Sequence, residues 1–86
     1  MIIVWDEPKR LANLDKHGLD FASVDLDFFV DAVIAPTKKG RFKAIGYLNG
    51  VLTVVVIFAP LGTEALSIIS LRRAKAKERS LINGQC

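Results

Sequence analysis

Histidine is the residue type whose ordinary pKa lies near neutrality, and this sequence contains a single one, His17. His17 lies between Lys16 and Gly18, at the end of an expected helix. A histidine in that place can transfer protons to and from a substrate. It can equally stabilise the helix end, where a cation favours the helix dipole and bonds the last carbonyls. The sequence leaves both interpretations of His17 open.

The basic residues gather in two places that could bind an anion. The first group is Lys38, Lys39, Arg41 and Lys43, and the second is Arg72, Arg73, Lys75, Lys77 and Arg79. We expect a C-terminal helix over residues 71–82 with Ser70 as its cap, which places Arg72 and Arg73 in the first turn. A cation there opposes the helix dipole, so the arrangement predicts a bound phosphate or partner carboxylate. The alternative is that both groups are solvated faces that keep a small protein in solution.

Other kinds of site find little support in the sequence. One cysteine, Cys86, and one histidine cannot supply a Cys/His zinc site, and one cysteine cannot form an internal disulfide. We therefore expect no metal, no cofactor and a cytoplasmic location. The sequence also contains no GxSxG elbow and no phosphate-binding glycine loop.

Size and charge limit the architecture further. The chain has 86 residues, which is enough for one domain over 1–86. Its composition, 51% hydrophobic and 24% charged, excludes an intrinsically disordered chain. The net charge of +3 permits an anionic partner without requiring one.

A long uncharged segment raises the question of a membrane span. Residues 44–63 carry no charge, and about 20 apolar residues are enough to cross a bilayer. The dipeptide Asn49-Gly50, however, lies in the middle of this segment between two runs rich in β-branched and aromatic residues. Asn-Gly favours the positive φ angles of a type I′ turn, so we expect a buried hairpin and no membrane partner.

The remaining elements follow from apolar spacing and helix caps. Residues 1–5, 32–35, 42–48, 51–58 and 66–71 are candidate strands, with a break at Pro60. A first helix begins after Asp6 and ends at Gly18, and a second begins after Asp20 with Phe21, Val24 and Phe28 on one side. We expect an α+β domain in which two N-terminal helices and one C-terminal helix pack on an antiparallel sheet of about four strands.

Three segments, spread in order over nearly the whole chain, resemble the BrnT toxin family. Residues 4–21 contain Trp5-Asp6, Lys9, Asn13, Lys16-His17-Gly18 and Phe21, which is similar to the opening of that family. Residues 40–46 resemble its arginine-to-Ile-Gly strand. Residues 68–74 and 77–79 resemble its Ile-Ser-x-Arg-x-Ala and Glu-Arg ending.

The resemblance implies a RelE-like fold and a type II toxin–antitoxin function. It implies a metal-independent endoribonuclease that cuts RNA, inhibits translation and growth, and is neutralised by a BrnA-type antitoxin in a hetero-oligomer such as a heterotetramer. DNA is then contacted only through the antitoxin, and the complex represses its own operon.

Cleavage of RNA without a metal needs a base, an acid and cations at the phosphate, and this chain offers candidates for each. The candidate catalytic residues are His17, Lys16, Arg41, Arg72 and Glu78, and the candidate RNA-binding residues are Lys38, Lys39, Lys43, Arg73 and Lys75. Arg41 and Arg72 would clamp the phosphate while His17 or Lys16 moves protons. Glu78 is a second candidate base, although an ion pair with Lys75 is the simpler account. Asp6 and Asn13 would hold the first helix in place.

Two positions depart from the family pattern. Ser67 stands where many members have arginine, and Ile82 lies near a position where many have tyrosine. The alternative function is a non-catalytic module whose basic residues grip an acidic protein partner or nucleic acid.

Overall fold

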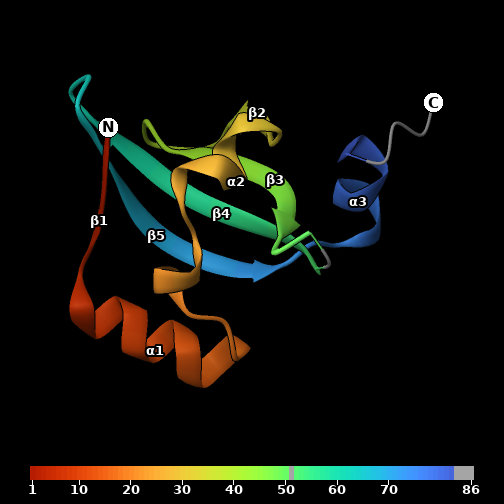
Figure 1. The fold of residues 1–86 in the computed structure, drawn as a ribbon, viewed down its shortest axis with the longest axis horizontal. Coiled ribbons are helices and arrows are strands. Elements are labelled where there is room, and N and C mark those ends of the chain that lie inside the picture. Colours follow the sequence, from red (N-terminus) through yellow and green to blue (C-terminus); the bar gives the residue numbers. More distant parts are fainter. Residues whose placement is uncertain (51, 83–86) are drawn as a thin grey trace.

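The computed structural model describes residues 1–50 and 52–82, which form a five-stranded sheet and three α-helices (Figure 1). The strands are β1 (Ile2–Trp5), β2 (Val33–Pro36), β3 (Phe42–Leu48), β4 (Leu52–Leu61) and β5 (Ala65–Arg73). The helices are α1 (Glu7–His17), α2 (Leu26–Val30) and α3 (Ala76–Ile82), and a 3-10 turn, η1, spans Phe21–Ser23. The predicted α+β class is confirmed.

The sheet is mixed, whereas an antiparallel sheet of about four strands was predicted. Strands β2 to β5 pair with their neighbours in the chain and are antiparallel, but β1 pairs in parallel with β5. Short connections between consecutive strands favour antiparallel pairing, and they are visible in a sequence. The partner of β1 lies at the other end of the chain, and no local signal specifies that pairing.

The predicted hairpin at Asn49-Gly50 is confirmed. Asn49 has φ 55° and Gly50 has φ 72°, as a type I′ turn requires, and Leu48 pairs with Leu52 across the turn. The first residue of the predicted second strand, Val51, lies outside the described residues. β4 continues through Pro60, where we predicted a break. Because β3 begins at Phe42, opposite Phe58, the edge of β4 that faces β3 is open from Ala59 onward, and an open edge tolerates proline.

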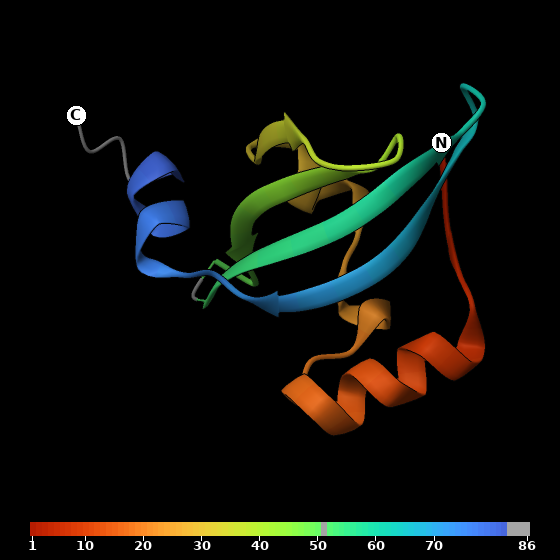
Figure 2. The same ribbon diagram turned by 180° about the vertical axis from the view of Figure 1, so that it is seen from behind.

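The two faces of the sheet are covered very differently. The helical segments α1, η1 and α2 lie on one face, where Phe21, Phe28, Ile68 and Leu71 belong to the main core. On the other face α3 stands only at one end of the strands, as Figure 2 shows from behind. We call this second side the open face, and alternation along the strands places these side chains on it: Ile2, Val4, Lys43, Ile45, Val55, Ile57, Ala59, Leu61, Ala65, Ser67, Ser70 and Arg72.

The predicted second helix is two shorter elements. Asp20 accepts a hydrogen bond from the backbone N–H of Ala22 and caps η1, while Asp25 accepts one from Phe28 and caps α2. An aspartate that bonds nearby backbone in an extended conformation competes with a continuing helix, and Asp25 has φ −120° and ψ −179°. The apolar residues of the predicted stripe are nevertheless buried in the main core.

The predicted start of the C-terminal helix was wrong. β5 continues to Arg73, so Arg72 and Arg73 lie on a strand and not in a first helical turn, and Ser70 caps no helix. Leu71 is fully buried and pairs with Val56 of β4, which favours continued strand over a helix start. The predicted phosphate site at that helix start is therefore absent from the described part of the chain. The predicted helix stop at residues 83–84 lies outside the described residues.

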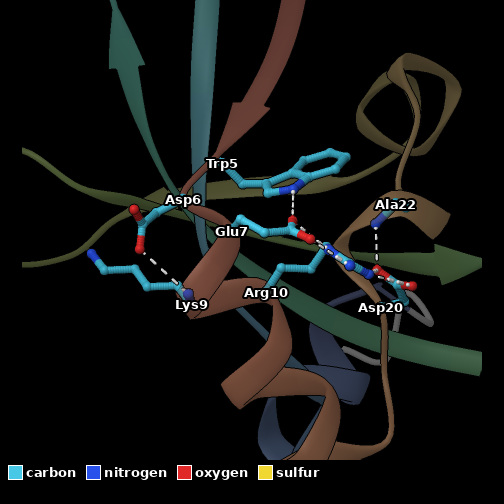
Figure 3. A network of polar contacts seen from close by, with 7 residues as sticks. All are labelled: Trp5, Asp6, Glu7, Lys9, Arg10, Asp20 and Ala22. Atoms are coloured by element: carbon cyan, nitrogen blue, oxygen red, sulfur yellow. Dashed lines mark hydrogen bonds and ion pairs between the residues drawn. The ribbon is translucent and has the colours of Figure 1, made fainter.

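A network of polar contacts fixes the beginning of α1 (Figure 3). Arg10 donates from Nε and Nη2 to the two carboxylate oxygens of Glu7 (2.7 Å each) and from Nη1 to both oxygens of Asp20 (3.1 Å each). The indole N–H of Trp5 also donates to Glu7 (3.2 Å), which links the end of β1 to the helix. The hydrogen bonds from Arg10 lower the pKa of Glu7 to about 2.

Asn13 joins α1 to the edge of the sheet. β1 pairs with β5 only as far as Ile68. Beyond that point the side-chain amide of Asn13 hydrogen-bonds the backbone of β5, as a neighbouring strand would. Its Nδ2 donates to the carbonyl of Leu71 (2.8 Å), and its Oδ1 accepts from the N–H of Leu71 (3.1 Å). Nδ2 also donates to the carbonyl of Leu19 (3.1 Å). The positioning roles predicted for Asp6, which accepts from the N–H of Lys9, and for Asn13 agree with these contacts.

Candidate functional site

The candidate site residues lie in three groups around the open face. One group is at the edge of the sheet beside α1, one is at the turn between β2 and β3, and one is where α3 meets β3 and β5.

The first group contains both proton-transfer candidates. Lys16 and half-buried His17, on the last turn of α1, line a hollow of about 310 Å³ together with Ser70 of β5. Lys9, Ala12, Asn13 and Ile69 complete its wall. The helix that carries His17 ends at Gly18, whose φ of 69° is the left-handed conformation that glycine adopts without strain.

The second group is basic and follows the tight turn at residues 37–41. Lys38, Lys39 and Arg41 are exposed and line a hollow of about 360 Å³ with Thr37 and with Ile57 of β4. Two backbone hydrogen bonds hold the turn, from Thr37 to Arg41 (2.8 Å) and from Arg41 to Lys38 (3.1 Å). The turn therefore presents three cations beside the open face.

The third group is an ion cluster on buried Glu78. Nη1 of Arg72 donates to Oε1 of Glu78 (2.8 Å), and Nη2 donates to Oε2 (2.9 Å). The Lys43 Nζ atom lies 3.6 Å from Oε2, and the backbone N–H of Lys75 donates to Oε1 (2.8 Å). We predicted that Glu78 pairs with the side chain of Lys75, whereas in the structure the backbone N–H of Lys75 donates to Glu78.

Hydrogen bonds from Arg72 are the largest influence on this carboxylate and lower the pKa of Glu78 to about 2. The same bonds raise the pKa of Arg72. Glu78 is thus a carboxylate throughout the physiological range, held among cations. Arg73 and the Lys75 side chain are exposed, and Arg73, which pairs with the core residue Val54, lies on the opposite face of β5 from Arg72.

Strand register shows how the three groups are related. Lys43 pairs with Ile57, and Ile57 pairs with Ser70, so one row across the open face links the ion cluster to both hollows. With strands spaced about 4.8 Å apart, Lys43 and Ser70 are about 10 Å apart between Cα atoms. Arg72 lies two strands across and four residues along from Arg41, a separation of about 17 Å between Cα atoms.

The sequence did not point to every residue of the hollow beside His17. Ser70 is predicted as a helix cap and Lys9 is named only in the resemblance to the family, yet both line this hollow. The signal was present on α1, because Lys9, Asn13 and Lys16 are spaced i, i+4 and i+7 and therefore share one side of a helix.

The two departures from the family pattern also have places in the structure. Ser67 lies half-buried on the open face, paired with Ala59 and with Val4. Ile82 packs against the small cluster formed by Ile45, Val55 and Ala74.

The described residues show neither a metal-ligand cluster nor a membrane helix. Among residues 1–50 and 52–82, no three His, Cys, Asp or Glu side chains come together as metal ligands would. Within the same residues, no helix has the length and apolar character needed to cross a bilayer. Cys86 lies outside them.

Comparison with known proteins gives the family. The family model described as "Ribonuclease toxin, BrnT, of type II toxin-antitoxin system" matches residues 5–78. This chain belongs to the BrnT toxin family. It is also similar to a BrnT ribonuclease toxin from Brucella abortus whose crystal structure is known at 1.1 Å resolution. The two share 55% sequence identity with a TM-score of 0.84, over 87% of this chain and 97% of that one. No protein with a curated description matches this chain.

Membership of the family establishes the class of function. A BrnT chain is the toxin of a type II toxin–antitoxin system, it is named for ribonuclease activity, and the system implies a protein antitoxin as partner.

Proposed function

We propose that this BrnT protein is a metal-independent endoribonuclease whose RNA substrate lies across the open face. The observation that supports it is the row from Lys43 through Ile57 to Ser70, which connects cationic groups on one side with His17 on the other. RNA-binding residues in this proposal are Lys38, Lys39, Lys43 and Lys75, together with Arg73, which would reach the RNA from the opposite face at the end of β5. Cleavage by such a toxin inhibits translation and growth.

The chemistry is transfer of the phosphoryl group to the neighbouring 2′-hydroxyl. The 2′-oxygen attacks phosphorus and gives up its proton to a base, while the 5′-oxygen leaves and takes a proton from an acid. The products are a 2′,3′-cyclic phosphate and a 5′-hydroxyl. His17 serves as base or acid, Lys16 serves as its partner, and both line the same hollow.

Arginines stabilise the charge that develops on the phosphorane. Arg41 and Arg72 lie about 17 Å apart between Cα atoms, and in this proposal they bind neighbouring phosphates of the RNA. Lys43 lies between them in the register and supplies the cation nearest to Ile57.

Glu78 acts in this proposal by positioning Arg72. A carboxylate with a pKa of about 2 is a weak base near neutral pH. Its two hydrogen bonds to Arg72 instead fix the guanidinium toward the end of the open face. Of the two roles predicted for Glu78, positioning is the one that its contacts favour.

The partner we propose is a BrnA-type antitoxin that forms a hetero-oligomer with the toxin, such as a heterotetramer. DNA is contacted through the antitoxin, and the complex represses its own operon. The chain acts in the cytoplasm and needs no cofactor.

A non-catalytic binding module is the second candidate, and one observation favours it. Both Nη atoms of Arg72 are already bonded to Glu78, so that carboxylate offsets part of the charge that the guanidinium would offer to a phosphate. In this alternative, the basic groups bind RNA or an acidic protein without cutting.

Cleavage of purified RNA in the presence of EDTA tests the proposal. The wild-type protein should leave 2′,3′-cyclic phosphate ends, and Arg41→Ala and His17→Ala should each slow cleavage at least 100-fold. Lys77→Ala, which removes a cation from exposed α3 outside the three groups, should cleave like the wild type. Tight RNA binding by folded wild-type protein without any cleavage would favour the binding module.

A further inference from the structure

An apolar strip on the open face lies beside the proposed RNA site and has no covering element among the described residues. It consists of Ile2 and Val4 of β1, Ala65 and Ser67 of β5, and Ala59 and Leu61 of β4. α3 contacts the opposite end of this face, near Ile45 and Val55. Figure 2 shows β4 and β5 with no helix in front of them there.

Strand register makes the strip continuous. Ile2 pairs with Ala65, which pairs with Leu61, and in the next row Val4 pairs with Ser67, which pairs with Ala59. Ile2 is 63% exposed, Leu61 is 51% exposed and Val4 is 37% exposed. Contiguous exposed apolar surface of this kind marks an interaction site more often than scattered apolar residues do.

The chemistry of the strip does not suit RNA. Single-stranded RNA is bound by stacking its bases on aromatic side chains or on guanidinium planes. The strip contains only aliphatic residues and one serine, so it offers neither. Aliphatic side chains are what an apolar stripe of another protein packs against.

The row next to the strip, Ile57 and Ser70, has cations at both of its ends. The turn with Lys38, Lys39 and Arg41 lies beside Ile57, and the α1 hollow with Lys9 and Lys16 lies beyond β5. An aliphatic strip next to cationic groups is complementary to an amphipathic segment with apolar residues on one side and Asp or Glu on its flanks.

The width of the strip fits a helix. It covers three strands, which is two interstrand spacings or about 10 Å. An α-helix with its side chains is about 10–12 Å across. One helix laid along β5 therefore covers the strip and reaches the cations at the ends of the next row.

We propose that an acidic amphipathic helix of the antitoxin docks on this strip and neutralises the toxin by covering the RNA site. The blocking of RNA rests on the proposed function, because the helix would cover the cations that bind RNA in that proposal. The docking itself does not depend on cleavage.

The test uses the full-length toxin and the full-length antitoxin encoded beside it, with affinity measured by titration calorimetry. Ile2→Asp and Leu61→Asp place a carboxylate at exposed ends of one row, and each should weaken antitoxin binding at least 10-fold. Val30→Asp is the matched control, because Val30 is 75% exposed on α2, away from the open face. It should bind the antitoxin within twofold of wild type.

Two further measurements complete the design. Raising NaCl from 50 to 300 mM should weaken antitoxin binding at least fivefold, as expected for an acidic segment between cations. Without antitoxin, Ile2→Asp and Leu61→Asp should cleave RNA at the wild-type rate, and antitoxin should protect RNA from wild-type toxin but poorly from these variants. Circular dichroism and thermal unfolding establish that each variant is folded.

Three results would overturn the proposal. The first is wild-type affinity in both strip variants, and the second is weaker binding in Val30→Asp alone, which moves the docking site to α2. The third is a wild-type toxin dimer that Ile2→Asp converts to monomer with antitoxin affinity unchanged, which assigns the strip to a second copy of this chain. If no variant and no wild-type protein cleaves RNA, the ribonuclease proposal fails while the affinities still decide the docking site.

Discussion

The guanidinium of Arg72 and the carboxylate of Glu78 meet through two parallel hydrogen bonds, of 2.8 and 2.9 Å. The pair joins the end of β5 to the first turn of α3. Glu78 also accepts a hydrogen bond from the backbone N–H of Lys75, three residues earlier. In a capping box the Glu at the third helical position makes this same bond to the N-cap residue. One carboxylate therefore caps a helix, fixes it to the sheet and orients an arginine of the proposed RNA site.

We expect Glu78→Gln to lower the free energy of unfolding by about 1–3 kcal/mol, because a charge-assisted bidentate pair is lost at a buried position. Urea denaturation measures this change. Glu64→Gln, at an exposed carboxylate, is the control and should stay within about 0.5 kcal/mol of wild type. A loss equal to that of the control would mean that the pair does not hold α3.

The same carboxylate predicts an acid dependence of stability. The pKa of Glu78 is lowered from 4.5 to about 2 in the folded protein, so the unfolded chain binds this proton first as the pH falls. The stabilisation is complete above about pH 4.5 and is lost between pH 4.5 and 2. Unfolding free energies measured across that range should fall less steeply in Glu78→Gln than in wild type. Parallel curves for the two proteins would contradict the assignment.

Among substitutions of polar residues, those at Asn13 should lower the free energy of unfolding most strongly. Asn13→Ala leaves the N–H and carbonyl of Leu71 without their partner at the buried edge of β5, at a cost of about 2–3 kcal/mol. Asn13→Asp should also destabilise, since a carboxylate cannot donate to the Leu71 and Leu19 carbonyls. Asp15→Ala, exposed on the same helix, serves as control in chemical denaturation. Similar values for all three variants would show that the edge is satisfied in another way.

Gly46 is required by the packing of α2 on β3. A Cβ atom at this position would lie 2.9 Å from Cε1 and 3.1 Å from Cζ of Phe28. Gly46→Ala should therefore lower stability by about 1–3 kcal/mol, as overpacked cores do. Adding Phe28→Leu should cost less in the Gly46→Ala background than in wild type, and a double-mutant cycle measures this coupling. Strict additivity would contradict the steric explanation.

The distance between Arg41 and Arg72 predicts that they act independently on RNA. Groups about 17 Å apart with no shared partner have additive effects, within about 0.5 kcal/mol. Binding of a 2′-O-methyl RNA, which cannot be cleaved by attack of the 2′-oxygen, should weaken in each alanine variant and by the sum in the double variant. Strong non-additivity would instead indicate a shared phosphate.

Elements whose signals are local could be predicted from the sequence. Asp6, Gly18 and Asn49-Gly50 act through their own backbone conformation, and the helix bounds and hairpin they predict are present. The parallel pairing of β1 could not be predicted, because it depends on residues more than 60 positions away. The boundary of β5 was misplaced because Ser70 is a common cap residue, and only burial of Leu71 against β4 decides for a strand.

The candidate site was predictable as a set of residues but not as an arrangement. Residue types identified the cations and His17, since few side chains can do that chemistry. Their division into three groups follows from strand register, which places Lys43, Ile57 and Ser70 in one row. The pairing of Glu78 with Arg72 depended on the helix start at Ala76, which the sequence interpretation placed five residues too early.

The parallel pairing of the first strand with the last also bears on synthesis of the toxin. A ribosome releases β1 and α1 first, yet both need β5 for their hydrogen bonds, through Ile68 and through Leu71. The edge that carries His17 is therefore assembled only after β5 has emerged. A prematurely terminated chain that stops before β5 lacks the floor of that hollow and both arginines of the last strand. The topology thus withholds the proposed site from a nascent chain that still lacks β5.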